Sequence, residues 1–242
     1  MIKFFRKIRQ NLLSEGKTGK YFKYAIGEII LVVIGILIAL QINNWNQNRL
    51  QQKQLLSVYE RTLTDINNDI QEFTAIVKHH DSIEYIFKRV INDSISPDLF
   101  DVGLSRLVTS NSVTTTLNIT GVNQLKALNT NDSLSLKIIE IYDQMKLIII
   151  DNLEVAINQE SENLQKIFME KYDWYPEYMS KTIMQNNSSK ELKDYFLYSK
   201  EYRHHVVNNY NSRYPNYVTS IKLSIEILND ITEELKIVLD NS

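Results

Sequence analysis

An uninterrupted apolar run near the N-terminus constrains the fold of this chain more than any other feature. Residues 24–42 read YAIGEIILVVIGILIALQI, and a helix of this length extends about 28 Å at 1.5 Å per residue. The hydrocarbon core of a bilayer is about 30 Å thick, so the run is long enough to cross it once. We therefore predict a transmembrane helix at 24–42, a tail at 1–23 and a separate domain at 43–242.

Charged residues flank this run unequally. Seven lysines and arginines precede it against the single Glu15, whereas the polar segment 43–48 that follows carries no charge before Arg49. Short segments rich in lysine and arginine beside a span stay on the cytoplasmic side of the membrane. We therefore predict a cytoplasmic N-terminus, a single membrane span and a C-terminal domain on the opposite side of the membrane.

A cleaved signal peptide is the competing interpretation of the same pattern. The end of the run, residues 38–41, lacks the Ala-x-Ala pattern that a signal peptidase recognises. The chain contains no cysteine, so it has no lipid-modified cysteine, disulfide or thiolate metal ligand. We favour an uncleaved anchor and an exported domain that is stabilised by its apolar core alone.

The basic tail has its own helical pattern. Phe5, Ile8 and Leu12 recur at helical spacing among basic residues, which is typical of an amphipathic helix that lies on anionic lipid headgroups. Residues 14–19 are expected to end that helix. The tail is thus predicted to lie at the inner surface of the membrane.

Four residues of the run are candidates for contacts between transmembrane helices. Gly35 and Ala39 form a small-xxx-small pair, and Gly27 lies two turns earlier on a similar face. Glu28 is the one ionisable side chain in the run, where it either contacts another span or reaches the headgroup zone about one turn from the edge. A partner protein or a second copy of the chain is therefore expected to bind through the span.

Two stretches of the chain resemble a known family. The first, FFRKIRQNLLSEGKTGKYFKYAIGEIILVVIGILIALQINNWNQNR, closely resembles the N-terminal signature of a large family of uncharacterised single-span bacterial membrane proteins, known by a domain-of-unknown-function label. The second, TTTLNITGVNQLKALNTNDSLSLKIIEIY at 114–142, is similar to the middle segment of that family. The resemblance implies an anchor in a bacterial inner membrane with an exported, periplasmic helical domain, and it brings no known activity or catalytic residues.

The exported part is predicted to be all-α. No glycine or proline lies between Trp45 and Ser96, so the span is expected to continue as one helix to about Ile91. Ser96-Pro97 should begin a short helix through Val108. Residues 109–120 lack a helical period and should form a loop or a short extended piece. The heptad seam predicted for the long helix comprises Leu56, Tyr59, Leu63, Ile66, Ile70, Phe73 and Val77.

Four further helices are predicted after the loop. A short helix at 121–128 should precede capping residues at 129–132 and a long helix to about Phe168. A helix at 189–209 should kink or end at Tyr214-Pro215 before the last helix. We expect these helices to form an up-and-down bundle that covers the seam. The predicted helix that ends at about Phe168 has an apolar stripe of Leu134, Ile138, Ile141, Met145 and Ile148. The 189–209 helix carries Tyr195, Tyr198 and Tyr202 on one face.

Few residues suggest chemistry. The pairs His79-His80 and His204-His205 are adjacent on predicted helices and point about 100° apart, so neither pair chelates one metal ion. No nucleophile elbow or other local catalytic signature is present in the sequence. We therefore predict no catalytic residue, no metal site and no cofactor, and a protein that is not an enzyme.

Aromatic residues gather in one segment. Nine of the 14 tyrosines fall between Tyr172 and Tyr217. Tyr172, Trp174, Tyr175 and Tyr178 are either an aromatic surface that binds a partner or ligand, or rings packed into the end of the bundle. The second interpretation is the one we favour from sequence.

Two serines are candidates for periplasmic O-glycosylation. Ser94 and Ser133 each lie in an Asp-Ser-aliphatic triplet, which looks similar to the acceptor motif of some bacteria. A third triplet, at Asp81-Ser82-Ile83, lies within a predicted helix, where access to Ser82 would be poor.

Two classes of function remain in competition. The first is a non-enzymatic scaffold or accessory subunit of a membrane complex, and the second is a ligand-sensing helical module, which rests on architectural analogy alone. A tail of about 23 residues leaves no room for a signalling domain, so a sensor would need a separate output subunit. We favour the scaffold, with the lipid bilayer and a protein as partners and with no nucleic acid partner.

Overall fold

The computed structural model describes residues 18–108, 112–184 and 188–241. The predicted tail helix and its break lie almost entirely outside these residues. The described residues form helices without any strand, which confirms the predicted all-α class. The elements are α2 (Thr18–Ile91), α3 (Asp98–Val102), η1 (Leu104–Leu107), α4 (Thr120–Leu128), α5 (Ser133–Met145), η2 (Lys146–Glu154), α6 (Val155–Lys171), α7 (Tyr175–Met184), α8 (Lys190–Tyr198), α9 (Lys200–Ser212), η3 (Arg213–Val218) and α10 (Thr219–Asp240).

Helix α2 contains both the apolar run and the first helix of the bundle. It ends at Ile91, as the sequence predicts, and Asp93 follows in a left-handed conformation with φ of 59°. The chain divides into two compact units, Met1–Leu56 and Ser57–Ser242.

The first unit contains one candidate membrane span among the described residues. The helix is long and apolar enough to cross a bilayer, and none of the residues in its most apolar 18-residue window is buried. Large aliphatic side chains between Ile29 and Ile42 are about half exposed or more, at 45–63 %. A run of this kind is unstable in water and needs lipid or protein around it.

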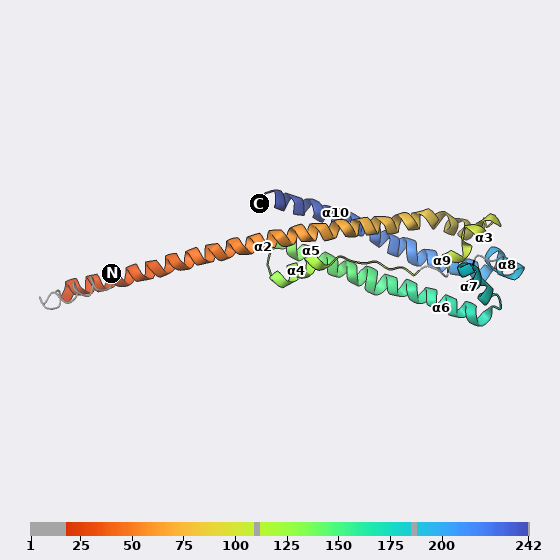
Figure 1. The fold of residues 1–242 in the computed structure, drawn as a ribbon, viewed down its shortest axis with the longest axis horizontal. Coiled ribbons are helices and arrows are strands. Elements are labelled where there is room, and N and C mark those ends of the chain that lie inside the picture. The colour runs from red at the N-terminus through yellow and green to blue at the C-terminus, as the bar shows by residue number, and fades with distance from the viewer. Residues whose placement is uncertain (1–17, 109–111, 185–187, 242) are drawn as a thin grey trace. The chain divides into compact units, whose positions relative to one another are not determined.

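The second unit is a bundle of three long helical regions. The C-terminal half of α2 lies alongside the continuous region α5–η2–α6 and the continuous region α9–η3–α10 (Figure 1). Aromatic and aliphatic side chains fill the space between them because each helix carries an apolar stripe. Fully buried members of this core include Ile66, Phe73, Phe87, Ile138, Phe168, Val206, Ile221 and Leu228.

The buried face of α2 differs from the predicted seam. Tyr59, Ile66 and Phe73 are buried as predicted, but the other four seam residues are only half-buried. Thr62, Asp65 and Asp69 lie deeper, at 0–1 % exposure. An apolar heptad cannot identify these positions, since polar side chains occupy them.

Several predicted elements are interrupted or extended. Gly103, with φ of 122°, divides the segment predicted as one helix to Val108 into α3 and η1. The helix predicted at 189–209 is broken at Ser199, whose hydroxyl accepts a hydrogen bond from the Tyr202 backbone N–H and so caps α9. Tyr198 is therefore 72 % exposed instead of sharing a buried face with Tyr195 and Tyr202.

Two helical stretches adopt the wider π geometry. In η2 the buried positions step by five residues, from Ile149 to Glu154. Before that step the buried positions are Ile138, Tyr142, Met145 and Ile149, at spacings of three and four residues, so Ile148 of the predicted stripe lies outside the core. Of the two outcomes predicted at Tyr214-Pro215, a kink or an end of the helix, the end does not occur, because the helix continues through Pro215 in the π geometry of η3. Both stretches place polar side chains in the core.

Candidate functional site: a carboxylate row on helix α2

Three carboxylates follow one face of α2. Asp65, Asp69 and Glu72 are separated by four and three residues, which places them on the same side of a helix. Asp65 and Asp69 are 1 % and 0 % exposed. Buried carboxylates need hydrogen-bond donors, and the bundle supplies them from a segment far along the chain.

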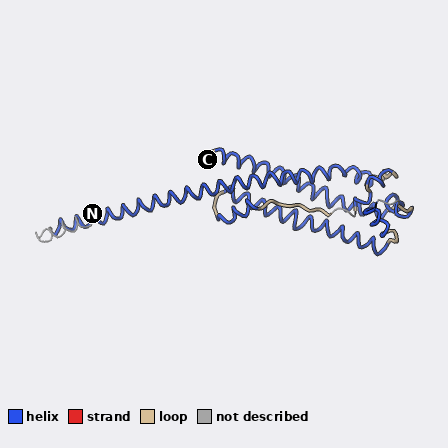
Figure 2. The backbone as a smooth tube through the Cα atoms, in the orientation of Figure 1, coloured by secondary structure: helices blue, strands red, loops and turns tan. Residues whose placement is uncertain are grey.

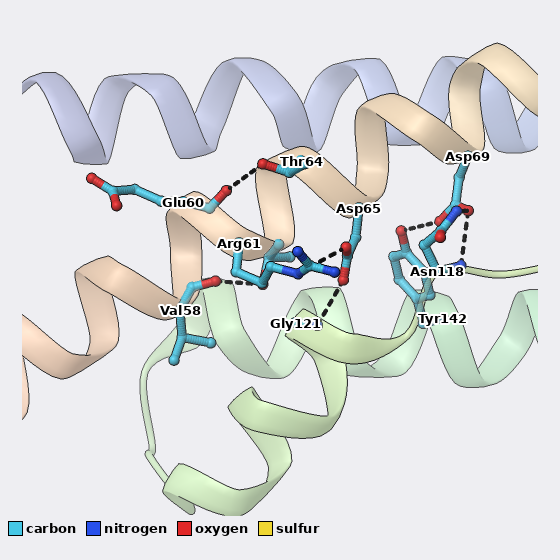
Figure 3. A network of polar contacts seen from close by, with 10 residues as sticks. Val58, Glu60, Arg61, Thr64, Asp65, Asp69, Asn118, Gly121 and Tyr142 are labelled. Carbon is cyan, nitrogen blue, oxygen red and sulfur yellow. Dashed lines mark hydrogen bonds and ion pairs between the residues drawn. The ribbon is translucent and has the colours of Figure 1, made fainter.

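That segment is the extended stretch 112–119, which we call the strap. It runs along the helices as a loop in Figure 2. Glu72 accepts a hydrogen bond from the Thr116 backbone N–H at 2.9 Å, and Asp69 accepts one from the Asn118 N–H at 2.9 Å. Asp65 accepts one from the Gly121 N–H, in the first turn of α4, at 2.7 Å (Figure 3). The carboxylates of the row thus accept hydrogen bonds from backbone N–H groups, as the carbonyl groups of a neighbouring strand would in a sheet.

Asp69 is the most heavily bonded member of the row. Besides the Asn118 backbone, it accepts hydrogen bonds from the Asn118 side-chain amide at 2.8 Å and from the Tyr142 hydroxyl at 2.6 Å. Burial raises the pKa of Asp69, and the hydrogen bonds from Tyr142 and Asn118 oppose that rise. Asp69 therefore joins α2, the strap and α5 at one point.

Side chains of the other helical regions hold the opposite side of the strap. Asn158 accepts from the Val113 N–H at 2.8 Å and donates to the Val113 carbonyl at 2.9 Å. The Thr115 and Tyr217 hydroxyls are 2.8 Å apart, and Tyr217 donates to Glu154 at 3.2 Å. The strap is consequently fixed on both sides by buried or half-buried polar groups.

Glu154 lies where the two π stretches contact each other. It ends η2, is 5 % exposed and accepts from Tyr217 of η3. Burial raises the pKa of Glu154, while hydrogen bonds from Thr115 and Tyr217 counteract it. Since a regular helix would turn residue 154 away from the core, the π geometry is what brings this carboxyl to the strap.

A second polar layer lies next to η3. His80 of α2 is 4 % exposed, and its ring packs edge-on against Tyr214 and Tyr217 at 6.1 and 5.8 Å between centroids. Arg213 is 1 % exposed and donates through Nε to Asn209, which in turn donates to the Leu107 carbonyl at 2.8 Å. Burial lowers the pKa of Arg213 to about 10.

The burial of His80 predicts a pH-dependent stability. Burial, with smaller contributions from Arg213 and His79, lowers the pKa of His80 to about 4, so unfolding between pH 6.5 and 4 takes up a proton. We expect about 2 kcal/mol of the free energy of unfolding to be lost between pH 7 and pH 5 through this group. Denaturant titrations at both pH values measure this loss. It should be absent in His80→Gln and unchanged in His79→Gln, which alters the exposed neighbour. An equal slope in wild type and His80→Gln would contradict the assignment.

Gly121 fits its position because a Cβ atom there would collide with α2. The added atom would lie 2.7 Å from the Thr62 Cα and 2.9 Å from the Thr62 nitrogen. We expect Gly121→Ala to lower the free energy of unfolding by about 2–3 kcal/mol, although alanine is favoured over glycine in an isolated helix by about 1 kcal/mol. Asn123→Ala, at an exposed position of α4, is the matched control for chemical denaturation and should change little. A Gly121→Ala variant at least as stable as wild type would show that α4 can move away from α2.

The four aromatic candidates divide into two buried and two half-buried rings. Trp174 and Tyr178 are 6 % and 7 % exposed. Tyr172 stacks on Trp174 at 4.8 Å and donates to Glu201 at 2.7 Å, and Tyr175 is half-buried. This burial favours packing for Trp174 and Tyr178. The surface that remains for a partner comes from the outer edges of the other two rings.

The remaining sequence candidates are exposed or half-buried. Ser94 lies in the turn after α2, where its hydroxyl donates to the Arg89 carbonyl at 3.0 Å, and Ser133 begins α5. A Cβ atom at Gly27 or Gly35 would meet nothing within 4 Å, and Ala39 is exposed. Glu28 is half-buried. These residues are accessible, and the structure brings none of them to the strap.

The chemistry that this site offers is hydrogen bonding and proton binding. In the described part of the chain, no group of three or more histidine, cysteine, aspartate or glutamate side chains could hold a metal ion. The carboxyls of the row instead accept from backbone amides. We did not identify Asp65, Asp69, Glu154 and Arg213 from the sequence. Two aspartates four residues apart within an apolar helical stripe are a signal that could have indicated the row.

The described residues thus form an all-α protein with one candidate span and, inside its bundle, a set of polar side chains that holds the strap. Comparisons of the chain with protein-family models, with curated protein sequences and with solved structures found no match.

Proposed function

We propose that this chain is a single-pass protein of a bacterial inner membrane. In this proposal its N-terminus is cytoplasmic, and its periplasmic helical domain acts as a non-enzymatic scaffold or accessory subunit of a membrane complex. Membership of the single-span family that residues 4–49 resemble is part of the same proposal.

One observation carries the proposal. The apolar residues between Ile29 and Ile42 are exposed on all sides of α2. An exposed apolar surface that surrounds a helix requires a lipid or protein environment. The basic residues before the span and the uncharged segment after it support the orientation.

The outer surface of the bundle supports a role in binding a protein. Leu136, Leu147 and Ile148 of α5 and η2 are 51 %, 56 % and 47 % exposed. Leu136 and Leu147 line the same hollow. Exposed aliphatic clusters of this kind are common at interfaces between subunits.

The experiment is a pull-down of the tagged full-length chain from detergent-solubilised native membranes. The scaffold function predicts a stoichiometric partner that the double variant Leu136→Glu/Leu147→Glu fails to retain. Lys166→Glu, an exposed charge change on α6 of the same continuous helical region, is the control and should retain it. Recovery of no partner above background, or equal recovery with all variants, would contradict the scaffold function.

The ligand-sensing alternative is favoured by one observation. A hollow of 320 Å³ lies beside η3, lined by side chains of α2, α9, η3 and α10. Pockets formed by several elements around an irregular helical turn are typical ligand sites.

A further inference from the structure

The hollow beside η3 combines an aromatic wall with charges of both signs. Its volume of 320 Å³ is at the lower end of the range for small-molecule sites. The residues that line it come from segments separated by more than a hundred positions of sequence. They include Asp81, Glu84, Tyr210, Tyr214, Pro215 and Lys222.

The aromatic wall is fixed by hydrogen bonds. Tyr210 and Tyr214 stack with 4.6 Å between centroids and 24° between ring planes. The Tyr210 hydroxyl donates to Glu84 at 2.9 Å, and the Tyr214 hydroxyl donates to the His80 carbonyl at 2.9 Å. Phe87 packs against Tyr214 at 5.4 Å. Tyr214 is 8 % exposed, so the half-buried Tyr210 is the ring of this wall that a ligand can reach. It suits an apolar or aromatic group because a ring held in this way need not reorganise on binding.

One ion pair in the hollow can be opened at low cost. Lys222 contacts Asp81 at 3.1 Å, and the two side chains are 50 % and 52 % exposed. Exposed pairs of this kind contribute little to stability. Glu84, in contrast, already accepts from Tyr210 and pairs with Lys88 at 2.8 Å. The charges offered to a ligand are therefore one carboxylate, at Asp81, and one ammonium, at Lys222.

We propose that this hollow binds a small zwitterion, of the class of a free amino acid with an aromatic or large apolar side chain. The ligand's ammonium group pairs with Asp81, its carboxylate pairs with Lys222, and its side chain packs on the half-buried Tyr210 and the exposed Pro215, which both line the hollow. One exposed ion pair is replaced by two that the aromatic wall partly shields from water. A ligand with a single charge would leave either Asp81 or Lys222 without its partner. The inference goes beyond the scaffold function and does not depend on the orientation of the span.

Calorimetric titration of the purified full-length chain in detergent tests the site with L-phenylalanine as the probe. Phenethylamine and 3-phenylpropionate, which each lack one charge, should bind at least about tenfold more weakly than L-phenylalanine. The variants Asp81→Asn and Lys222→Ala should bind L-phenylalanine more weakly by the same factor. Each of these changes removes one charged hydrogen bond. Lys236→Ala is the matched control. This lysine lies on α10, is 50 % exposed and pairs with Glu233, as Lys222 pairs with Asp81, and its loss should leave the affinity unchanged.

Three results would overturn the proposal. The first is absence of L-phenylalanine binding up to about 10 mM, where even a weak site would be occupied. The second is equal binding of a singly charged analogue, which would exclude recognition of a zwitterion. The third is unchanged affinity in both Asp81→Asn and Lys222→Ala, which would place the ligand elsewhere. Circular dichroism of each variant, whose altered side chain is half exposed, confirms that the comparison is between folded proteins.

Discussion

Replacing Asp69 with alanine is expected to lower the free energy of unfolding by about 3–5 kcal/mol. Asp69 accepts hydrogen bonds from the Tyr142 hydroxyl and from the backbone and side-chain amides of Asn118, and its side chain is fully buried. Alanine would leave these donors without an acceptor in the core. Denaturant unfolding of the full-length chain in detergent, followed by circular dichroism at 222 nm, measures the loss.

Hydrogen exchange gives this prediction a local measurement. The Asn118 backbone amide should exchange much faster in Asp69→Ala, since the strap loses its central acceptor on α2. Asn68→Ala, at the exposed neighbouring position, should change both stability and exchange little. If Asp69→Ala lost less than about 1 kcal/mol, the carboxylate row would not be what holds the strap.

Replacing Trp174 with alanine is expected to lower the free energy of unfolding by about 3–5 kcal/mol. Its ring is buried among Phe168, Tyr172, Tyr195 and Phe196, with centroid distances of 4.8–5.8 Å. Removing the ring leaves a cavity at this end of the bundle and breaks several aromatic contacts. Thermal and denaturant unfolding of the full-length variant check the effect.

Tyr198→Ala is the control for the aromatic segment. Tyr198 lies close by in sequence at the end of α8 and is 72 % exposed, so its loss should change stability by no more than about 0.5 kcal/mol. A Trp174→Ala variant that kept its stability but no longer retained a native partner would contradict the packing interpretation. The segment 172–178 would then be the partner surface of the protein.

Local signals in the sequence predicted several elements well. The end of α2 at Ile91 follows from an absence of glycine and proline up to that point and from the polar turn after it. The short helix α4 and the Asp132 cap of α5 are also local features, since Asp132 accepts from the Ser135 N–H three residues later. Such signals depend on neighbours in sequence and need no knowledge of the tertiary structure.

The candidate site could not be predicted in the same way. Asp69 and Asn118 are 49 residues apart, and Glu154 and Tyr217 are 63 residues apart. No periodic pattern pairs such positions. The five-residue step from Ile149 to Glu154 in η2 also falls outside the three- and four-residue spacing by which helical stripes are recognised, so the apolar pattern does not indicate Glu154.

The central claim is that one span anchors an exported domain, and cysteine labelling tests it most directly. The chain has no cysteine of its own, so single cysteines at Lys7 and Asp240 report on the two sides of the span. In intact spheroplasts, a membrane-impermeant maleimide should label Asp240→Cys and should label Lys7→Cys only after the membrane is disrupted. Labelling of Lys7→Cys alone in intact spheroplasts, or a mature chain that has lost residue 7, would contradict the account.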